Sequence, residues 1–136
     1  MLSLSKNNYF GKDFYKFILP EVITEYFDIT SVQELGEIKT KKVHLEIFLE
    51  EKNILPPGFE VSQYESKGFS SSSRIQDFPI RGKGVYLNIK RRRWRNKQSK
   101  QQITKDLSIV SEGSKISKEF ADFLKEFNRI PRRYRK

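Results

Sequence analysis

The residues that could do chemistry gather in one basic stretch, which reads IKRRRWRNKQSK over residues 89 to 100. Seven of the eleven residues from 90 to 100 are Lys or Arg, and none is Asp or Glu. Guanidinium groups match phosphate oxygens in a bidentate geometry, and aromatic rings can stack on a base or a sugar. The stretch is therefore typical of a surface that binds a polyanion, with nucleic acid as the first candidate.

We predict that the arginines of this stretch grip phosphates or guanine edges and that Trp94 stacks or wedges. The predicted nucleic-acid-binding residues are Lys83, Lys90, Arg91, Arg92, Arg93, Trp94, Arg95 and Lys97. Auxiliary contacts are predicted for Tyr86, Arg81, Lys100, Arg132 and Arg133. Changing Arg91, Arg93 and Arg95 together to Ala is expected to abolish binding without unfolding the domain.

A solvated edge strand is the main structural alternative, because Lys and Arg on an edge prevent aggregation. That protection usually needs one or two charges, and this stretch has seven. The wider charge distribution also favours a polyanionic partner. The chain has a net charge of +10, and no acid lies between Asp77 and Asp106, where ten bases occur.

Catalytic and metal-binding residues are not predicted. His44 is the only histidine, and no partner for general base chemistry can be named for it. The chain has no cysteine, which excludes disulfides and thiolate metal sites. We interpret Glu46, Glu50 and Glu51 as solvating an exposed strand edge. The expectation is a protein that is not an enzyme, with no cofactor, no metal and no small-molecule substrate.

The elements that position the basic stretch are two predicted hairpins. Residues 43 to 51 alternate, with Val43, Leu45, Ile47 and Leu49 on one face, and residues 28 to 36 are a plausible partner strand. Residues 74 to 80 and 84 to 94 form the second hairpin across the turn RGKG. Beyond residue 90 both faces of the last strand become basic, which predicts a ribbon that leaves the core.

The flanking segments are predicted to be helices and loops. Residues 12 to 27 indicate two short helices that meet at Pro20, and residues 53 to 74 are predicted to be a loop. Residues 103 to 110 are a possible further strand. Ser117 is the predicted N-cap of a helix whose apolar stripe is Phe120, Phe123, Leu124 and Phe127. We expect this stripe to face the core, and Phe127 is the member most suspected of facing a partner.

The predicted fold class is α+β: a small antiparallel sheet of two β-hairpins, flanked by short N-terminal helices and a C-terminal helix. Residues 1–127 are expected to form one domain with a basic β-ribbon at 75–97, and residues 128–136 a basic tail. No run of about 18 apolar residues occurs, so no membrane span is expected. The N-terminus lacks the apolar region of a secretory signal, and the expected location is the cytoplasm.

Several stretches resemble a known family. The sequences ILPEVITEYFDITSV, VHLEIFLEEKN, SKGF, IQDFPIRGKGVYLNIKRRRW and SKEFADFLKEF cover, in order and spacing, most of residues 17 to 127. They resemble the N-terminal region proteins of ISAon-type bacterial insertion sequences. In that family a separate reading frame carries the DDE-type catalytic domain.

The basic hairpin is also distantly similar to a segment of ISL-type transposases, where paired cysteines hold zinc. Here the corresponding places read YESKGFSSSS and RNKQSK, without any cysteine. The zinc role therefore does not carry over, and we expect packing, through Tyr64 and Phe69, to hold this region.

The resemblance implies that the chain is a DNA-binding region of a transposase, which recognises the terminal repeats of the element or assists a catalytic transposase subunit. Two alternatives stay open. The chain is an RNA-binding module, or it is a protein-interaction subunit whose basic strand meets an acidic patch of the catalytic partner.

Overall fold

The computed structural model describes residues 17–37, 42–109 and 116–128. Its first sheet has four strands in the order β1-β2-β5-β4, namely β1 (Phe27–Glu37), β2 (Lys42–Glu51), β5 (Lys83–Lys90) and β4 (Ser73–Ile80). Both predicted hairpins are present as antiparallel pairs. The central pair, β2 with β5, is parallel. The α+β class is confirmed, but the sheet is mixed rather than wholly antiparallel.

The core lies on the predicted apolar face of this sheet. Ile47 and Leu49 of β2 and Val85, Leu87 and Ile89 of β5 are all at most 2% exposed. Their alternation with less buried neighbours follows from the period of two in a strand. Burying five such side chains contributes about 1.5–3 kcal/mol each before entropy is counted. The central strands are thus the most strongly specified part of the fold.

Pro79 lies in β4, which is an edge strand of the first sheet. Proline lacks a backbone donor and is therefore confined to sheet edges, strand starts and bulges. The pairing register of β4 with β5 shifts between Asp77 and Ile80, at the position of this proline. The turn after it places Arg81 and Gly82 at φ values of 50° and 80°. Glycine takes the second position without strain.

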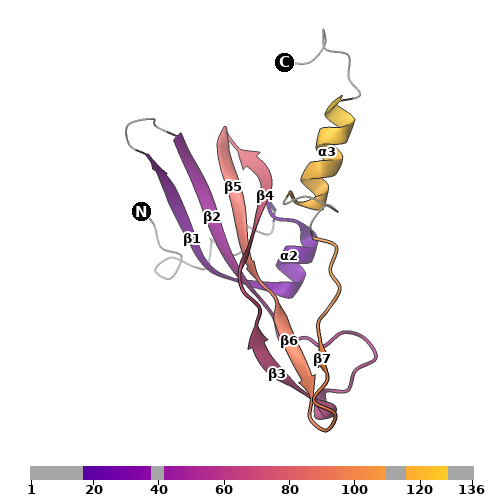
Figure 1. Ribbon diagram of the computed structural model, residues 1–136. Coiled ribbons are helices and arrows are strands. Elements are labelled where there is room, and N and C mark those ends of the chain that lie inside the picture. Colours follow the sequence, from indigo (N-terminus) through magenta and orange to yellow (C-terminus); the bar gives the residue numbers. More distant parts are fainter. Residues whose placement is uncertain (1–16, 38–41, 110–115, 129–136) are drawn as a thin grey trace.

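A second sheet extends from one end of the first, as Figure 1 shows. It has the strand order β3-β6-β7, with β3 (Tyr64–Phe69), β6 (Arg92–Asn96) and β7 (Gln102–Ile103). A short 3-10 helix, η1 (Val61–Gln63), precedes β3. Strand β6 continues the chain of β5 after one residue, Arg91.

This second sheet corrects two predictions. Residues 53 to 74 are not only loop, because β3 pairs with β6 in an antiparallel ladder. The possible strand at 103 to 110 is reduced to β7, which pairs only at Trp94 and Arg95. The basic ribbon therefore does not project alone, since β6 has a partner strand on each side.

The helices are α2 (Glu21–Tyr26) and α3 (Lys118–Asn128). Helix α2 begins after Pro20, as predicted, and buries Ile23 completely. The helix predicted before Pro20 is absent at residues 17–19, and its earlier part lies outside the described residues. Ser117 caps α3 by accepting a hydrogen bond from the backbone N–H of Phe120 at 3.3 Å, which confirms the predicted cap.

Helix α3 projects away from both sheets (Figure 1). Phe120 is 9% exposed and contacts Phe78 of β4, with ring centroids 5.1 Å apart. Phe123 lies 5.5 Å from Phe78 but is 50% exposed. The predicted apolar stripe is therefore core at Phe120 and only partly covered one turn later.

Candidate nucleic-acid interface

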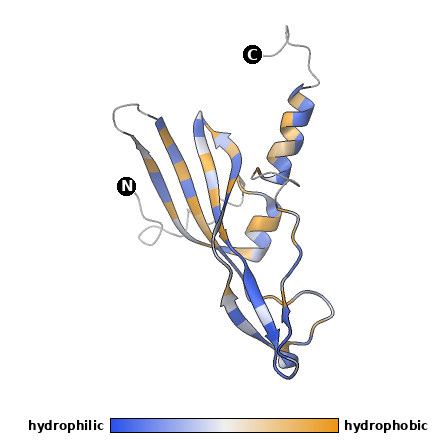
Figure 2. Cartoon of the chain, viewed as in Figure 1, coloured by the Kyte–Doolittle hydropathy of each residue, from blue (hydrophilic) through white to orange (hydrophobic). Residues whose placement is uncertain are grey.

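The two sheets differ in the sign of their excess charge. The four strands of the first sheet contain seven acids and four bases. The second sheet with its turns, residues 61–69 and 92–103, contains six bases and one acid. The two sheets also differ in hydropathy, because orange and blue alternate along the first sheet in Figure 2 while β6 is mostly blue. We call residues 61–69 and 92–103 the basic sheet.

Arg91 was predicted to grip phosphate, but it is a structural residue. It lies where the chain passes from β5 to β6, and its Nε donates to Glu51 Oε1 at 2.7 Å. Its Nη2 donates to the carbonyl oxygen of Lys105. Glu51 is 1% exposed, so the interpretation of Glu51 as a solvated edge residue is also wrong. The burial of this acid at the end of central strand β2 requires a cationic partner.

Arg92 also contacts Glu51, the residue that pairs with Arg91. Its backbone N–H donates to Glu51 Oε1 at 3.1 Å, and its Nε donates to the Glu51 carbonyl at 3.1 Å. Its guanidinium lies 4.6 Å from the centroid of the Phe69 ring and donates to Ser66 Oγ at 2.6 Å. Arg92 and Phe69 therefore pack β6 against β3, which agrees with the expected packing role of Phe69.

Trp94 cannot stack on a base in this structure, because it is 1% exposed. Its Nε1 donates to Asn53 Oδ1 at 2.8 Å, so the indole is both buried and hydrogen-bonded. A buried indole usually has a partner for its N–H, and Asn53 supplies it. The prediction of a stacking or wedging role is wrong. Trp94 is instead the central apolar side chain of the basic sheet.

Arg93 and Arg95 lie on the opposite side of β6 from Trp94. Arg95 Nη2 donates to Glu65 Oε1 at 2.6 Å, across the antiparallel pair with β3. The hydrogen bond and charge of Arg95 lower the pKa of Glu65 below its ordinary value of 4.5. Arg93 Nη2 donates weakly to the Phe69 carbonyl at 3.3 Å, while its Nε is buried without a partner.

The lysines of the basic sheet are its most accessible charges. Lys67, Lys97 and Lys100 are exposed. None of the three forms an ion pair within the described residues. Lys67 was not predicted as a site residue. Its signal in the sequence was present but weak, since it is a single lysine in a segment that was interpreted as loop.

The other predicted residues lie on the first sheet. Arg81 and Lys83 are at the β4–β5 turn, at the end of that sheet remote from the basic sheet (Figure 1). Lys83 and Lys90 each lie 4.0 Å from an acid, Glu34 and Glu50. The predicted set is thus divided among the basic sheet, the junction of the two sheets and the first sheet with its β4–β5 turn. Arg132 and Arg133 lie outside the described residues.

Tyr86 belongs to a polar cluster on the exposed face of the first sheet. The guanidinium of Arg74 lies 3.7 Å from its ring centroid, and His44 meets the ring edge-on. Glu46, which is 6% exposed, accepts hydrogen bonds from Arg74 and Asn88 at 3.0 Å each. Burial raises the pKa of Glu46, but these bonds and the Arg74 charge outweigh it and lower the pKa below 4.5. Glu46 is therefore not the solvated residue that was predicted.

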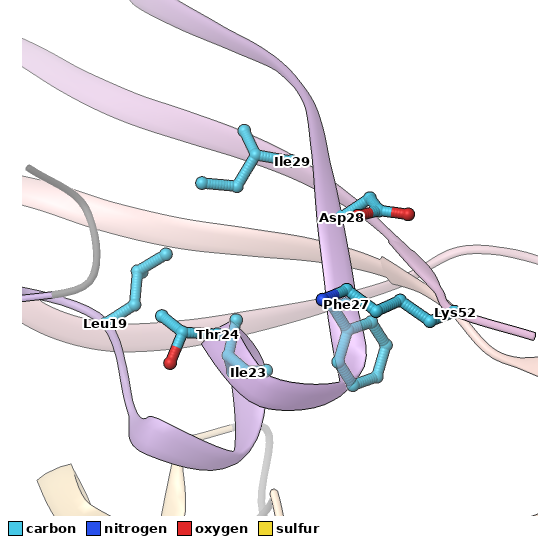
Figure 3. Close-up of a pocket in the computed structure, with 7 residues that line it drawn as sticks. All are labelled: Leu19, Ile23, Thr24, Phe27, Asp28, Ile29 and Lys52. Carbon is cyan, nitrogen blue, oxygen red and sulfur yellow. The ribbon is translucent and has the colours of Figure 1, made fainter. Parts of the chain in front are cut away.

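One mainly apolar pocket and one polar pocket bear on these surfaces. One, of about 120 Å³, lies between α2 and the start of β1, where Leu19, Ile23 and Ile29 line it beside Asp28 and Lys52 (Figure 3). The other, of about 260 Å³, lies at the far end of the basic sheet and is lined by Ser62, Gln63, Asn96, Lys97 and Gln98. Lys97, one of the accessible lysines, lines the polar pocket.

Residues 17–37, 42–109 and 116–128 contain no group of three or more His, Cys, Asp or Glu that could hold a metal ion. In the same parts of the chain, no helix combines the length and the apolar character that a membrane crossing needs.

Comparison with known proteins gave no relative. No family model matches the chain, and neither the curated proteins nor the solved structures contain a match.

Proposed function

We propose that this chain binds nucleic acid without catalysing a reaction, and that the basic sheet is the contact surface. The observation that carries the proposal is the charge separation, with six bases and one acid on the basic sheet and an excess of acids on the first sheet. A positive patch at one end of a molecule draws in a polyanion and orients it. The first sheet then serves as the scaffold.

The proposed phosphate contacts differ from the set predicted from sequence. Lys67, Lys97 and Lys100 provide mobile point charges, which suit phosphate without fixed geometry. Arg93 and Arg95, which are half-buried on the side of β6 opposite Trp94, add charge. Arg91 and Trp94 are assigned to the scaffold, because one neutralises Glu51 and the other is buried.

The family resemblance adds the identity of the nucleic acid. It supports DNA at the ends of an insertion sequence as the ligand and a DDE-type transposase as the subunit that the chain assists. The cytoplasm is the compartment where such DNA is met. RNA and an acidic protein surface are the alternatives, and the experiment below separates them.

The test is a gel-shift series at rising salt with duplex DNA from element ends. In one variant, Lys67, Lys97 and Lys100 are changed to Ala. A matched control changes three bases of the first sheet, Arg81, Lys83 and Lys90, to Ala. Each lost phosphate contact lowers the slope of log affinity against log salt by about 0.9. The first variant should therefore lose affinity and slope, while the control retains most of both.

Two outcomes overturn this proposal. Equal loss in both variants would mean that net charge, and not the basic sheet, drives binding. No binding of DNA by the wild-type chain would favour an alternative. Tighter binding of single-stranded RNA than of DNA would favour the RNA module, and nuclease-resistant association with a transposase would favour the interaction subunit.

A further inference from the structure

The polar pocket at the far end of the basic sheet is built from two separate segments. Ser62 and Gln63 come from η1, and Asn96, Lys97 and Gln98 come from the end of β6 and its turn. The Lys97 N–H donates to the Gln63 carbonyl at 2.9 Å, which joins the two walls. The volume, about 260 Å³, is larger than that of the apolar pocket beside α2.

One wall of this pocket is a hydrogen-bonded turn. Asn96 Oδ1 accepts from the backbone N–H groups of Gln98 and Ser99 at 2.9 and 3.0 Å. Lys100 N–H donates to the Asn96 carbonyl at 3.0 Å, and Lys100 itself has a φ of 65°. The turn is thus held in shape before any ligand arrives. Preformed sites lose less conformational entropy on binding.

The side chains around the pocket have unused hydrogen-bonding capacity. The side-chain amides of Gln63 and Gln98 form no hydrogen bond within the described part of the chain, and the ammonium group of Lys97 forms no ion pair there. A primary amide offers a donor and an acceptor side by side, which matches the edge of a nucleobase. A lysine beside such amides suits the adjoining phosphate.

A partly exposed aromatic ring, Phe59, contacts the residue that follows Gln63 of the pocket in the chain. Phe59 is 39% exposed and meets Tyr64 edge-on, with ring centroids 5.2 Å apart. Tyr64 follows Gln63 in the chain and pairs across the sheet with Asn96, another lining residue. Aromatic side chains beside a basic groove are the usual platform on which unpaired bases stack.

We propose that this pocket takes one unpaired base of a nucleic-acid strand, with Gln63 and Gln98 at its edge, Phe59 as a stacking surface and Lys97 on its phosphate. A base inside a duplex is stacked and cannot enter a recess, whereas an overhanging or extruded base can. The inference rests on the proposed function, because it extends phosphate binding by the basic sheet to recognition of unpaired strand ends.

The test compares two labelled DNAs by fluorescence anisotropy: a blunt duplex, and the same duplex with a single-stranded overhang. We expect the wild-type chain to bind the overhang DNA about tenfold more tightly, as one stacked and hydrogen-bonded base would provide. Phe59→Ala and Gln63→Ala should each remove most of this preference, measured as the ratio of the affinity for the overhang DNA to the affinity for the blunt duplex. Leu35→Ala, a truncation of a comparably exposed apolar residue on the first sheet, should retain it.

The outcomes separate the two proposals. Equal wild-type affinity for the two DNAs overturns the base pocket but leaves phosphate binding intact. Absence of binding to either DNA overturns the proposed function and the pocket together. Retention of the full overhang preference in both pocket variants also overturns the proposed binding of a base in this pocket. Thermal melting of each variant verifies folding, and Gln98→Ala is the second pocket variant if Gln63→Ala does not fold.

Discussion

The Arg91 Nε lies 2.7 Å from Oε1 of Glu51, and this ion pair joins the two sheets. Glu51 ends β2 in the first sheet, while Arg91 lies at the junction of β5 and β6. Glu51 Oε1 also accepts from the Arg92 N–H, so one carboxylate oxygen orients the first residues of β6. The first arginine of the basic stretch is thus engaged in the scaffold.

Arg91→Ala should destabilise the protein strongly, because it leaves a buried carboxylate without its cation. Removal of one partner of a buried pair costs about 3–5 kcal/mol. Lys90→Ala is the matched control, since Lys90 and Glu50 are both more than a third exposed and 4.0 Å apart. That pair is worth at most about 1 kcal/mol. Urea unfolding curves of the two variants measure the difference, and equal midpoints would contradict the structural role of Arg91.

This expectation replaces the one drawn from the sequence for the triple change at Arg91, Arg93 and Arg95. A protein lacking all three arginines would lose DNA binding because it unfolds. The loss would therefore not show whether these arginines contact DNA. The three lysines of the basic sheet are the better probes because they are exposed. Their removal tests the surface without disturbing the junction.

Trp94 provides a spectroscopic test, because it is the only tryptophan of the chain. Since it is 1% exposed, its emission should be blue-shifted and resistant to iodide in the folded protein. Saturating DNA should leave both properties unchanged, because bases cannot reach the indole. Unfolding in urea should shift the emission to the red and permit quenching, which serves as the positive control. Strong quenching by DNA, with the fold intact, would restore the stacking role predicted from sequence.

Glu65→Gln should increase the affinity for DNA. Glu65 is the only acid within residues 61–69 and 92–103, and it neutralises Arg95 across the pair of β3 and β6. Glutamine has the same shape but no charge, so Arg95 becomes available to phosphate. Folding stability should change little, since an exposed pair contributes little. A salt series should show a steeper slope than that of the wild type. Unchanged affinity and slope would place Arg95 outside the contact surface.

The sequence predicted the first sheet well, for a physical reason. Strands β2 and β5 alternate with a period of two, and one face must be buried, so Ile47 and Leu87 could be assigned to the core without a structure. The cap at Ser117 and the edge position of Pro79 depend on local backbone chemistry, which is also readable from sequence. The parallel contact between β2 and β5 was not readable, because no local pattern states which hairpin strands become neighbours.

The basic sheet was predicted less well, because its partners are distant in the chain. The acids that neutralise Arg91 and Arg95 are 40 and 30 residues away, at Glu51 and Glu65. Without them every arginine of the stretch looks available. For Trp94, the signal that could have helped is its size, since tryptophan is highly buried on average. The pocket residue Gln63 carries no local signal at all.

Asp77→Asn tests the contact that holds α3 on β4. Asp77 is 2% exposed and accepts a hydrogen bond from Ser117 Oγ at 2.7 Å. Burial raises the pKa of Asp77 above its ordinary value of 3.8, and the hydrogen bonds from Ser117 and the Phe78 N–H only partly offset it. The folded protein therefore holds this proton more tightly than the unfolded chain does.

The sign of the pH effect follows from that difference. The stabilising contribution of protonated Asp77 is complete below pH 3.8 and is lost as the pH rises through the higher folded pKa. Asparagine keeps an acceptor for Ser117 and cannot ionise, so Asp77→Asn should be more stable than the wild type at neutral pH. The advantage should shrink as the pH falls. Glu46, whose lowered pKa acts in the opposite direction, is present in both proteins and cancels in the comparison.

Thermal melts of the two proteins from neutral to acid pH measure the effect. Asp122→Asn, which removes the charge of an exposed acid of α3, is the control and should change the melting temperature little at neutral pH. A constant difference between wild type and Asp77→Asn at all pH values would show that Asp77 titrates normally. A variant that is less stable at neutral pH would show instead that the Ser117 bond needs the charged carboxylate.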